Sequence, residues 1–273
     1  MSTGPAGTVE TEPPPSDEVE GSADVQAPEG AVSSVRRLVV QPVVVLVIVI
    51  LVGIYVATAE LTPTEAGLLN LATLRQLTFE HLQLTAVTAV IVIAIGLPLG
   101  ILLTRPGARA GRPVGVGLAN LGQAAPSVGL LVLVATLIGV GFRTAVVGLA
   151  IYGVLPILRN TMTGLEQVDA RLVEAGRGMG MPAFGTLMRV EVPLAVPVIL
   201  TGIRLSLVLI VGTAALAPFI GGGGLGQLII TGVNLQLDKQ LIVGAILIAS
   251  LALLIDWVGR VVETLARPKG LSR

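Results

Sequence analysis

Apolar runs of about twenty residues alternate with short polar segments along most of the chain. An α-helix rises about 1.5 Å per residue, so roughly twenty apolar residues cross the ~30 Å hydrocarbon core of a bilayer. Six such runs can be drawn, at residues 38–57, 82–103, 116–140, 144–158, 192–219 and 241–262. The pattern predicts an all-α polytopic membrane protein with about six transmembrane helices.

The longest polar interruption in the second half of the chain separates the fourth and fifth runs. Within it, apolar side chains recur at the spacing of one helical face, at Val168, Leu172, Ala175 and Met179. Gly180 can adopt the positive φ that ends a helix, and Pro182 prevents the helix from continuing. We therefore expect a short amphipathic helix over residues 168–178, outside the bilayer. These residues alone leave open whether the helix binds a partner or only connects two spans.

Composition agrees with a membrane protein and narrows its chemistry. Of the 273 residues, 53% are hydrophobic and 12% are charged, whereas a soluble domain carries about 25% charged residues. The chain has no cysteine, and His81 is its single histidine, so cysteine and multi-histidine metal sites are excluded. No G-x-x-x-x-G-K-[ST] motif occurs, so a P-loop in this chain cannot hydrolyse ATP. We expect no metal, no cofactor and no nucleic-acid partner.

The charges divide the chain into segments. Residues 1–35 carry acids but no Lys or Arg, and we expect them to form a disordered acidic cytoplasmic tail. Residues 36–80 would form the first transmembrane helix and an outer loop with a short surface helix. Residues 81–265 would form the main transmembrane domain, and 266–273 a cytoplasmic C-terminal tail.

Basic residues predict the orientation, because cytoplasmic loops are enriched in Lys and Arg. With the N-terminus inside, most of the 17 basic residues fall in cytoplasmic segments, and few fall outside (Arg75, Arg143 and Lys239). Both termini and the loop at 159–191 are therefore expected in the cytoplasm.

Two charged residues lie well inside predicted spans. Arg204 is near the middle of the fifth span and Asp256 is in the inner half of the sixth. A charge at such a depth costs at least about 2.5–3.5 kcal/mol, so each should face protein or water. Antiparallel spans could bring the two together, either as a pair that opens and closes with a gate or as a static structural pair.

The run Gly221–Gly226 formally fits G-x-G-x-x-G, but it follows a membrane span rather than a strand of a soluble domain. We therefore reject nucleotide binding there. Backbone that bends and packs closely at the outer end of the bundle would suit an outer gate at Gly221 and Gly224, and a flexible loop is the alternative. Pro126, inside the third span, is a further candidate for the gate or pathway.

The loop after the fourth span resembles a motif of permease subunits of ATP-binding-cassette (ABC) importers. Their motif is Glu-Ala-Ala, three residues, Gly, nine residues, then Ile-x-Leu-Pro. This chain has matching spacing in Glu174-Ala175-Gly176, Gly180 and Val190-Glu191-Val192-Pro193. Gly176 departs from the second Ala, and Val190 and Val192 replace Ile and Leu. The resemblance implies a type I importer fold in which Glu174, Ala175, Gly176, Gly180 and Pro193 shape a coupling helix that docks on a separate ATPase.

Further segments are similar to the osmoprotectant branch of that family, which imports glycine betaine, choline, carnitine or related quaternary amines. They are 123–127, 152–161, 164–165 and 202–204. The resemblance covers about residues 80–262 and implies three partners: an ATPase, an extracytoplasmic solute-binding protein, and a second permease copy or a related permease. Two alternatives stay open, namely a permease for another small solute such as an amino acid, and an ATPase-independent channel or carrier.

Overall fold

The computed structural model describes residues 29–266, and every element in that range is helical. The elements in chain order are α1 (Glu29–Thr58), α2 (Pro63–Leu68), α3 (Leu71–Thr104), η1 (Pro106–Gly111), α4 (Arg112–Ala124), α5 (Ser127–Ile138), α6 (Phe142–Glu166), α7 (Ala170–Gly178), α8 (Ala183–Thr186), η2 (Leu187–Glu191), α9 (Val192–Thr213), η3 (Ala214–Ile220), α10 (Gly226–Leu235) and α11 (Asp238–Ala266).

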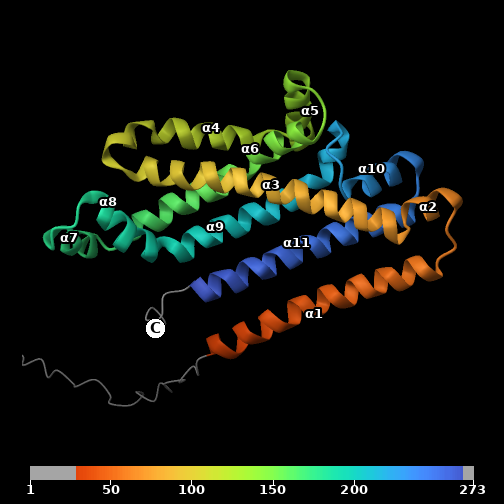
Figure 1. Ribbon diagram of the computed structural model, residues 1–273, viewed down its shortest axis with the longest axis horizontal. Helices are drawn as coiled ribbons and strands as arrows, with labels where there is room; N and C mark the ends of the chain where they lie inside the picture. The colour runs from red at the N-terminus through yellow and green to blue at the C-terminus, as the bar shows by residue number, and fades with distance from the viewer. Residues whose placement is uncertain (1–28, 267–273) are drawn as a thin grey trace, which may run out of the picture.

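The long helices lie side by side in an elongated bundle, in which α3, α6 and α11 run in one direction and α1 and α9 in the other (Figure 1). α6 packs against α3 and α9, α11 packs against α9, and α1 lies at the edge against α11. α7 and α8 project at one end, near the start of α1 and the end of α11, and we call this the α7 end. The opposite end carries α2, α10 and the segment 221–226, and we call it the glycine end.

The expected third span is not one straight helix. Five helical stretches are long and apolar enough to cross a membrane, and α4 with α5 would make a sixth, bent by 105°. Pro126 follows α4 and has no N–H to continue its hydrogen bonds, so the helix breaks there. The Tyr152 hydroxyl of α6 donates to the Ala125 carbonyl at the break. The bend between α4 and α5 is thus fixed by a partner from a neighbouring helix.

Several expected boundaries differ from the structure. α3 begins at Leu71, where the Asn70 side chain accepts a hydrogen bond from the backbone N–H of Thr73, so most of the expected outer loop is helical. The short helix expected in that loop is α2. Residues 29–35, expected within the tail, are the first turns of α1. The rest of the acidic tail and residues 267–273 lie outside the described residues.

Small residues let the core helices approach closely. A Cβ on Gly100 of α3 would lie 2.7 Å from Thr161 Cβ of α6, and one on Gly202 of α9 would lie 2.9 Å from the Pro156 carbonyl oxygen. These approaches pack both α3 and α9 against α6, so its middle is buried. α6 is therefore the central helix of the bundle.

Candidate functional site

α7 is a capped helix of its own at the end of the bundle. The Asp169 side chain accepts a hydrogen bond from the Arg171 backbone N–H at 2.9 Å. The Arg171 side chain also binds this carboxylate, and these bonds lower the pKa of Asp169. At the other terminus, the Gly180 N–H donates to the Arg177 carbonyl and the Met181 N–H to the Gly176 carbonyl. This Schellman geometry requires a positive φ at Gly180, which has +84°. The predicted helix and its glycine stop are confirmed.

The motif residues divide between an outer and an inner face of this segment. Glu174 and Ala175 are exposed, whereas Gly176 is buried against Thr186 and Val190. A Cβ on Gly176 would lie 3.5 Å from methyl carbons of both, an ordinary contact, so the structure has room for the alanine common in the similar motif.

Large apolar side chains are exposed along the same segment as Glu174, from α7 to η2. Their exposed fractions are 49% for Leu172, 72% for Met179, 71% for Phe184 and 41% for Met188. We call these four residues with Glu174 and Ala175 the α7 surface. Apolar side chains exposed together typically mark a binding site.

Pro193 lies in the first turn of α9, where a proline costs no helical hydrogen bond. The helix leading into it, η2, has π-helical geometry from Leu187 to Glu191. π-segments are rare and frequently occur at functional sites.

Sequence reasoning missed the ion pair that holds this segment. Arg105, which caps the end of α3, donates from Nη1 to Glu191 Oε1 at 3.2 Å and from Nη2 to Glu191 Oε2 at 2.7 Å. A glutamate within the apolar stretch Val190-Glu191-Val192 was the available signal, but nothing local points to Arg105.

Arg204 and Asp256 are neighbours, as antiparallel spans allowed. Arg204 Nη1 lies 3.1 Å from Asp256 Oδ1 between α9 and α11. The same group includes Arg260, 2.6 Å from Asp256, and Glu263, 3.6 Å from Arg204. Gln41 of α1 also donates to Asp256, at 3.2 Å. The pair is thus part of a charged network joining three helices.

The glycine run is closely packed. Gly221, Gly223 and Gly224 all have positive φ. Gly224 is buried, its N–H donates to Glu80 Oε2 at 3.0 Å, and a Cβ there would lie 3.1 Å from His81 Nδ1 and 3.2 Å from its Cα. The backbone is therefore closely packed at Gly224, and the gate role of the run stays a prediction.

His81 lies inside α3, although the apolar run that predicted this span begins at residue 82. It is fully buried in α3, and its Nε2 lies 3.1 Å from the Val211 carbonyl oxygen of α9. α3 begins at Leu71, eleven residues before the apolar run, so His81 is enclosed by neighbouring helices rather than placed at the end of its own.

The gate and pathway candidates fall at separate places. Pro126 is at the α4–α5 bend, Gly221 and Gly224 are at the glycine end, and Arg204 with Asp256 is between α9 and α11. Their roles stay predictions.

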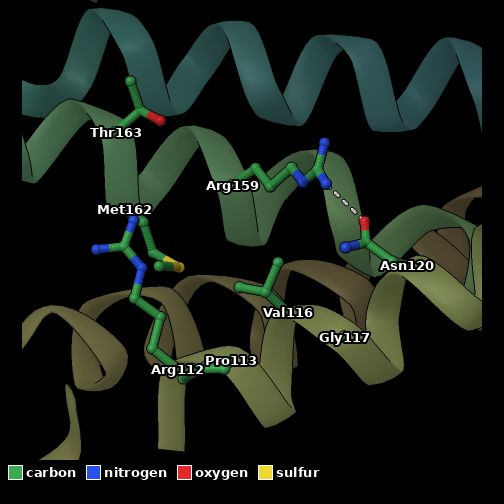
Figure 2. A pocket seen from close by; sticks show the side chains of 8 residues that line it. All are labelled: Arg112, Pro113, Val116, Gly117, Asn120, Arg159, Met162 and Thr163. Carbon is green, nitrogen blue, oxygen red and sulfur yellow. Dashed lines mark hydrogen bonds between the residues drawn. The ribbon is translucent and has the colours of Figure 1, made fainter. Parts of the chain in front are cut away.

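A cleft of about 390 Å³ lies between α4 and α6 (Figure 2). Arg159 of α6 donates to Asn120 Oδ1 of α4 at 2.6 Å, and Arg112 of α4 binds the Glu166 carboxylate of α6. Both arginines of the cleft therefore reach a partner on the opposite helix and hold α4 against α6.

A family profile described as the binding-protein-dependent transport system inner membrane component matches residues 96–268. The chain belongs to this family. It is 44% identical over 195 residues to the glycine betaine/carnitine/choline transport system permease protein OpuCB of Bacillus subtilis, covering 71% of this chain and 89% of that protein. It is 41% identical to the osmoprotectant import permease protein OsmW of Salmonella typhimurium, covering 74% and 95%.

Among solved structures, an inward-facing MetNI methionine ABC transporter matches with a TM-score of 0.62 and 27% identity, over 71% of this chain and 95% of that one. The chain is thus a multi-pass inner membrane protein with the fold of type I ABC importer permeases, and it resembles osmoprotectant permeases. The predicted family and fold class are confirmed. α1 and most of α3 precede the family match.

Proposed function

We propose that this chain is the permease subunit of an ATP-driven importer for a quaternary-amine osmoprotectant such as glycine betaine, choline or carnitine. It pairs with a second copy or a related permease, and solute crosses between the two bundles. A solute-binding protein outside delivers the solute, and a separate ATPase inside supplies the energy. The names of the similar permeases support this class of solute.

The α7 surface carries the proposal. It projects from the end of the bundle on a capped helix (Figure 1), and this segment exposes large apolar side chains as well as the Glu174 carboxylate. Large apolar side chains exposed together typically mark an interaction site, which supports docking of a partner here. An ATPase groove that covers these side chains and pairs a base with Glu174 fits both features.

The orientation is part of the proposal. The basic residues favour the cytoplasm for the α7 end. The described chain begins and ends toward this same end, so placing the ATPase there puts both termini inside (Figure 1).

ATP-driven closure of the ATPase would move α7 with it. α8, η2 and α9 are continuous, and α7 is joined to them by the turn at residues 179–182, so a displacement of α7 would tilt α9. Because α9 also carries Arg204 and leads to the glycine segment, the tilt reaches both candidate gates.

Selection of the solute is assigned to the binding protein. Quaternary ammonium groups are usually held by aromatic cages. This chain has one Trp, two Tyr and four Phe, and they are scattered along the sequence.

The test is reconstitution. The chain is co-expressed with candidate ATPase and binding-protein subunits, purified, and placed in liposomes with radiolabelled glycine betaine, choline, carnitine or methionine. We expect co-purification of an ATPase and uptake of a quaternary amine only with ATP inside. Uptake by this chain alone would establish a channel or carrier instead, and uptake of methionine alone would establish an amino-acid permease.

A further inference from the structure

The ion pair between Arg105 and Glu191 joins α3, a helix that spans the whole bundle, to the segment from α7 to η2, residues 170–191. We call these residues the coupling segment. Both carboxylate oxygens of Glu191 accept from Arg105, at 3.2 and 2.7 Å. Arg105 Nε also lies 3.2 Å from Thr104 Oγ1, which fixes the guanidinium against the end of α3. Such bidentate pairs define the relative orientation of two elements more strictly than single contacts do.

Glu191 is buried, with 6% of its surface exposed, and it ends the π-segment just before Pro193. Removal of Arg105 would leave its carboxylate buried without this partner, which is strongly unfavourable. The pair therefore holds the coupling segment in one position relative to α3.

Packing links this pair to α7. Gly176 of α7 lies against Val190, the residue before Glu191. Leu187, at the start of η2, packs in a core cluster with Leu97 and Ile101 of α3. Both the apolar packing and the ion pair therefore connect α7 mechanically to α3.

The other half of α3 is bonded to the glycine end. Glu80 accepts from the Gly224 N–H at 3.0 Å, and His81 Nε2 lies 3.1 Å from the Val211 carbonyl oxygen. From His81 to Arg105 the helix is continuous, a length of about 36 Å at 1.5 Å per residue. One helix is therefore hydrogen-bonded to the coupling segment near one end and to the candidate outer gate near the other.

We propose that Arg105 and Glu191 are positioning residues that pass the displacement of the coupling segment to α3, and through it to the glycine segment. The inference rests on the proposed function, since it assumes that α7 is moved by an ATPase. It assigns transmission to α3 in addition to the direct path along α9.

The chain provides a matched control. Arg112 and Glu166 also form a two-contact ion pair between helices close to this end, but they join α4 to α6 and their side chains are 44% and 41% exposed. The corresponding values for Arg105 and Glu191 are 30% and 8%. A general need for ion pairs at this end would make both pairs important, whereas transmission through α3 concerns only Arg105 and Glu191.

The experiment uses the complete transporter in liposomes with glycine betaine as the probe. Variants are Arg105→Gln, Glu191→Gln, the exchange Arg105→Glu with Glu191→Arg, and the control Arg112→Gln with Glu166→Gln. ATP hydrolysis and uptake are measured in the same vesicles. We expect each single variant to keep the ATPase bound and to lower solute transported per ATP about tenfold, within the usual range of coupling between sites. The exchange recovers most of the lost transport per ATP. In the control, solute transported per ATP stays within about twofold of the value for the unaltered protein.

A second readout does not depend on the solute. Because the chain has no cysteine, Phe219→Cys introduces a single thiol next to the glycine segment, at a side chain that is 54% exposed. We expect ATP to change its labelling by a membrane-impermeant maleimide in the otherwise unaltered protein and in the Arg112→Gln background, and to change it much less in the Arg105→Gln background, where only the path along α9 remains.

The outcomes separate the two proposals. Unchanged transport per ATP and unchanged ATP-dependent labelling in Arg105→Gln and Glu191→Gln would overturn the role of the pair. Loss of ATPase binding in these variants would do so too, because the pair would then only shape the docking surface. If the unaltered protein binds no ATPase, the proposed function itself fails.

Discussion

The α7 surface and the glycine segment lie at opposite ends of the same bundle, and each depends on a glycine with positive φ. Gly180 has φ +84° and nothing within 4 Å of the position of a Cβ, whereas Gly224 has φ +92° and packs against His81. At the α7 end, side chains point outward around a helix that caps itself. At the glycine end, backbone packs against α3, and a Cβ at Gly224 would lie closer to His81 than an ordinary contact.

This difference separates two ways of building a functional segment. The α7 segment has its own hydrogen bonds and leaves a surface for a partner that arrives from outside. The glycine segment takes its shape from its neighbours, so it follows them when they move. One end thus offers a docking surface, and at the other end the backbone conformation depends on the neighbouring helices. We expect this arrangement in a subunit that is moved by a partner and opens a pathway for solute.

The largest effect is expected from reversing the charge on the α7 surface. Glu174→Lys should abolish ATPase binding and uptake while membrane abundance stays unchanged, because a like charge in a docking interface costs several kcal/mol and Glu174 supports no other part of the fold. Co-purification and uptake measure this. Glu60→Lys, at an exposed site of the glycine end, is the control for charge reversal. Retained association would mean that α7 is only a connector.

A pair of alanine substitutions tests the contrast between the two glycines. Gly180→Ala should cost about 1–2 kcal/mol for its left-handed backbone alone. Gly224→Ala should cost about 1–3 kcal/mol more, because the new Cβ also meets His81. Thermal unfolding in detergent compares them. Equal costs would contradict the difference in packing.

In the charged network between α9 and α11, substitutions of Asp256 and of Arg204 should reduce uptake by different amounts. Asp256→Ala leaves both Arg204 and Arg260 without this carboxylate, whereas after Arg204→Ala the bond between Asp256 and Arg260 remains. We therefore expect Asp256→Ala to reduce uptake more. The double variant should lose less than the two losses combined, with a coupling of about 0.5–3 kcal/mol. Strictly additive losses, corrected for membrane abundance, would show that the two side chains do not act as a pair.

The smallest effect is expected at Gly176. Gly176→Ala should leave ATPase binding unchanged and raise helix stability by up to about 1 kcal/mol, since alanine favours the helix and its Cβ would make only ordinary contacts. Gly178→Ala, in the same helix with open space around it, is the matched control. A loss of ATPase binding in Gly176→Ala alone would show that η2 approaches α7 more closely than this geometry allows.

Features with local causes could be predicted. The spacing of apolar residues and the glycine stop predicted α7, and continuous apolar runs predicted the long helices, because helix periodicity and hydrophobic length act over neighbouring residues. Where polar residues continue a helix, as at the start of α3, the apolar pattern began too late and left His81 outside the predicted span. The bend at Pro126 was missed because proline in a membrane helix can be accommodated by neighbours, and only the position of Tyr152 shows how the break is satisfied.

By itself, the sequence determined the helical membrane class, the absence of a P-loop, and the α7 motif, since each follows from composition or from residues within one turn or loop. Only the tertiary structure decided that Glu191 meets Arg105, 86 positions away, and that Gly224 rests on His81 and Glu80. The reason is physical: a buried charge or a close backbone approach is specified by which helices become neighbours, and that depends on packing across the whole bundle.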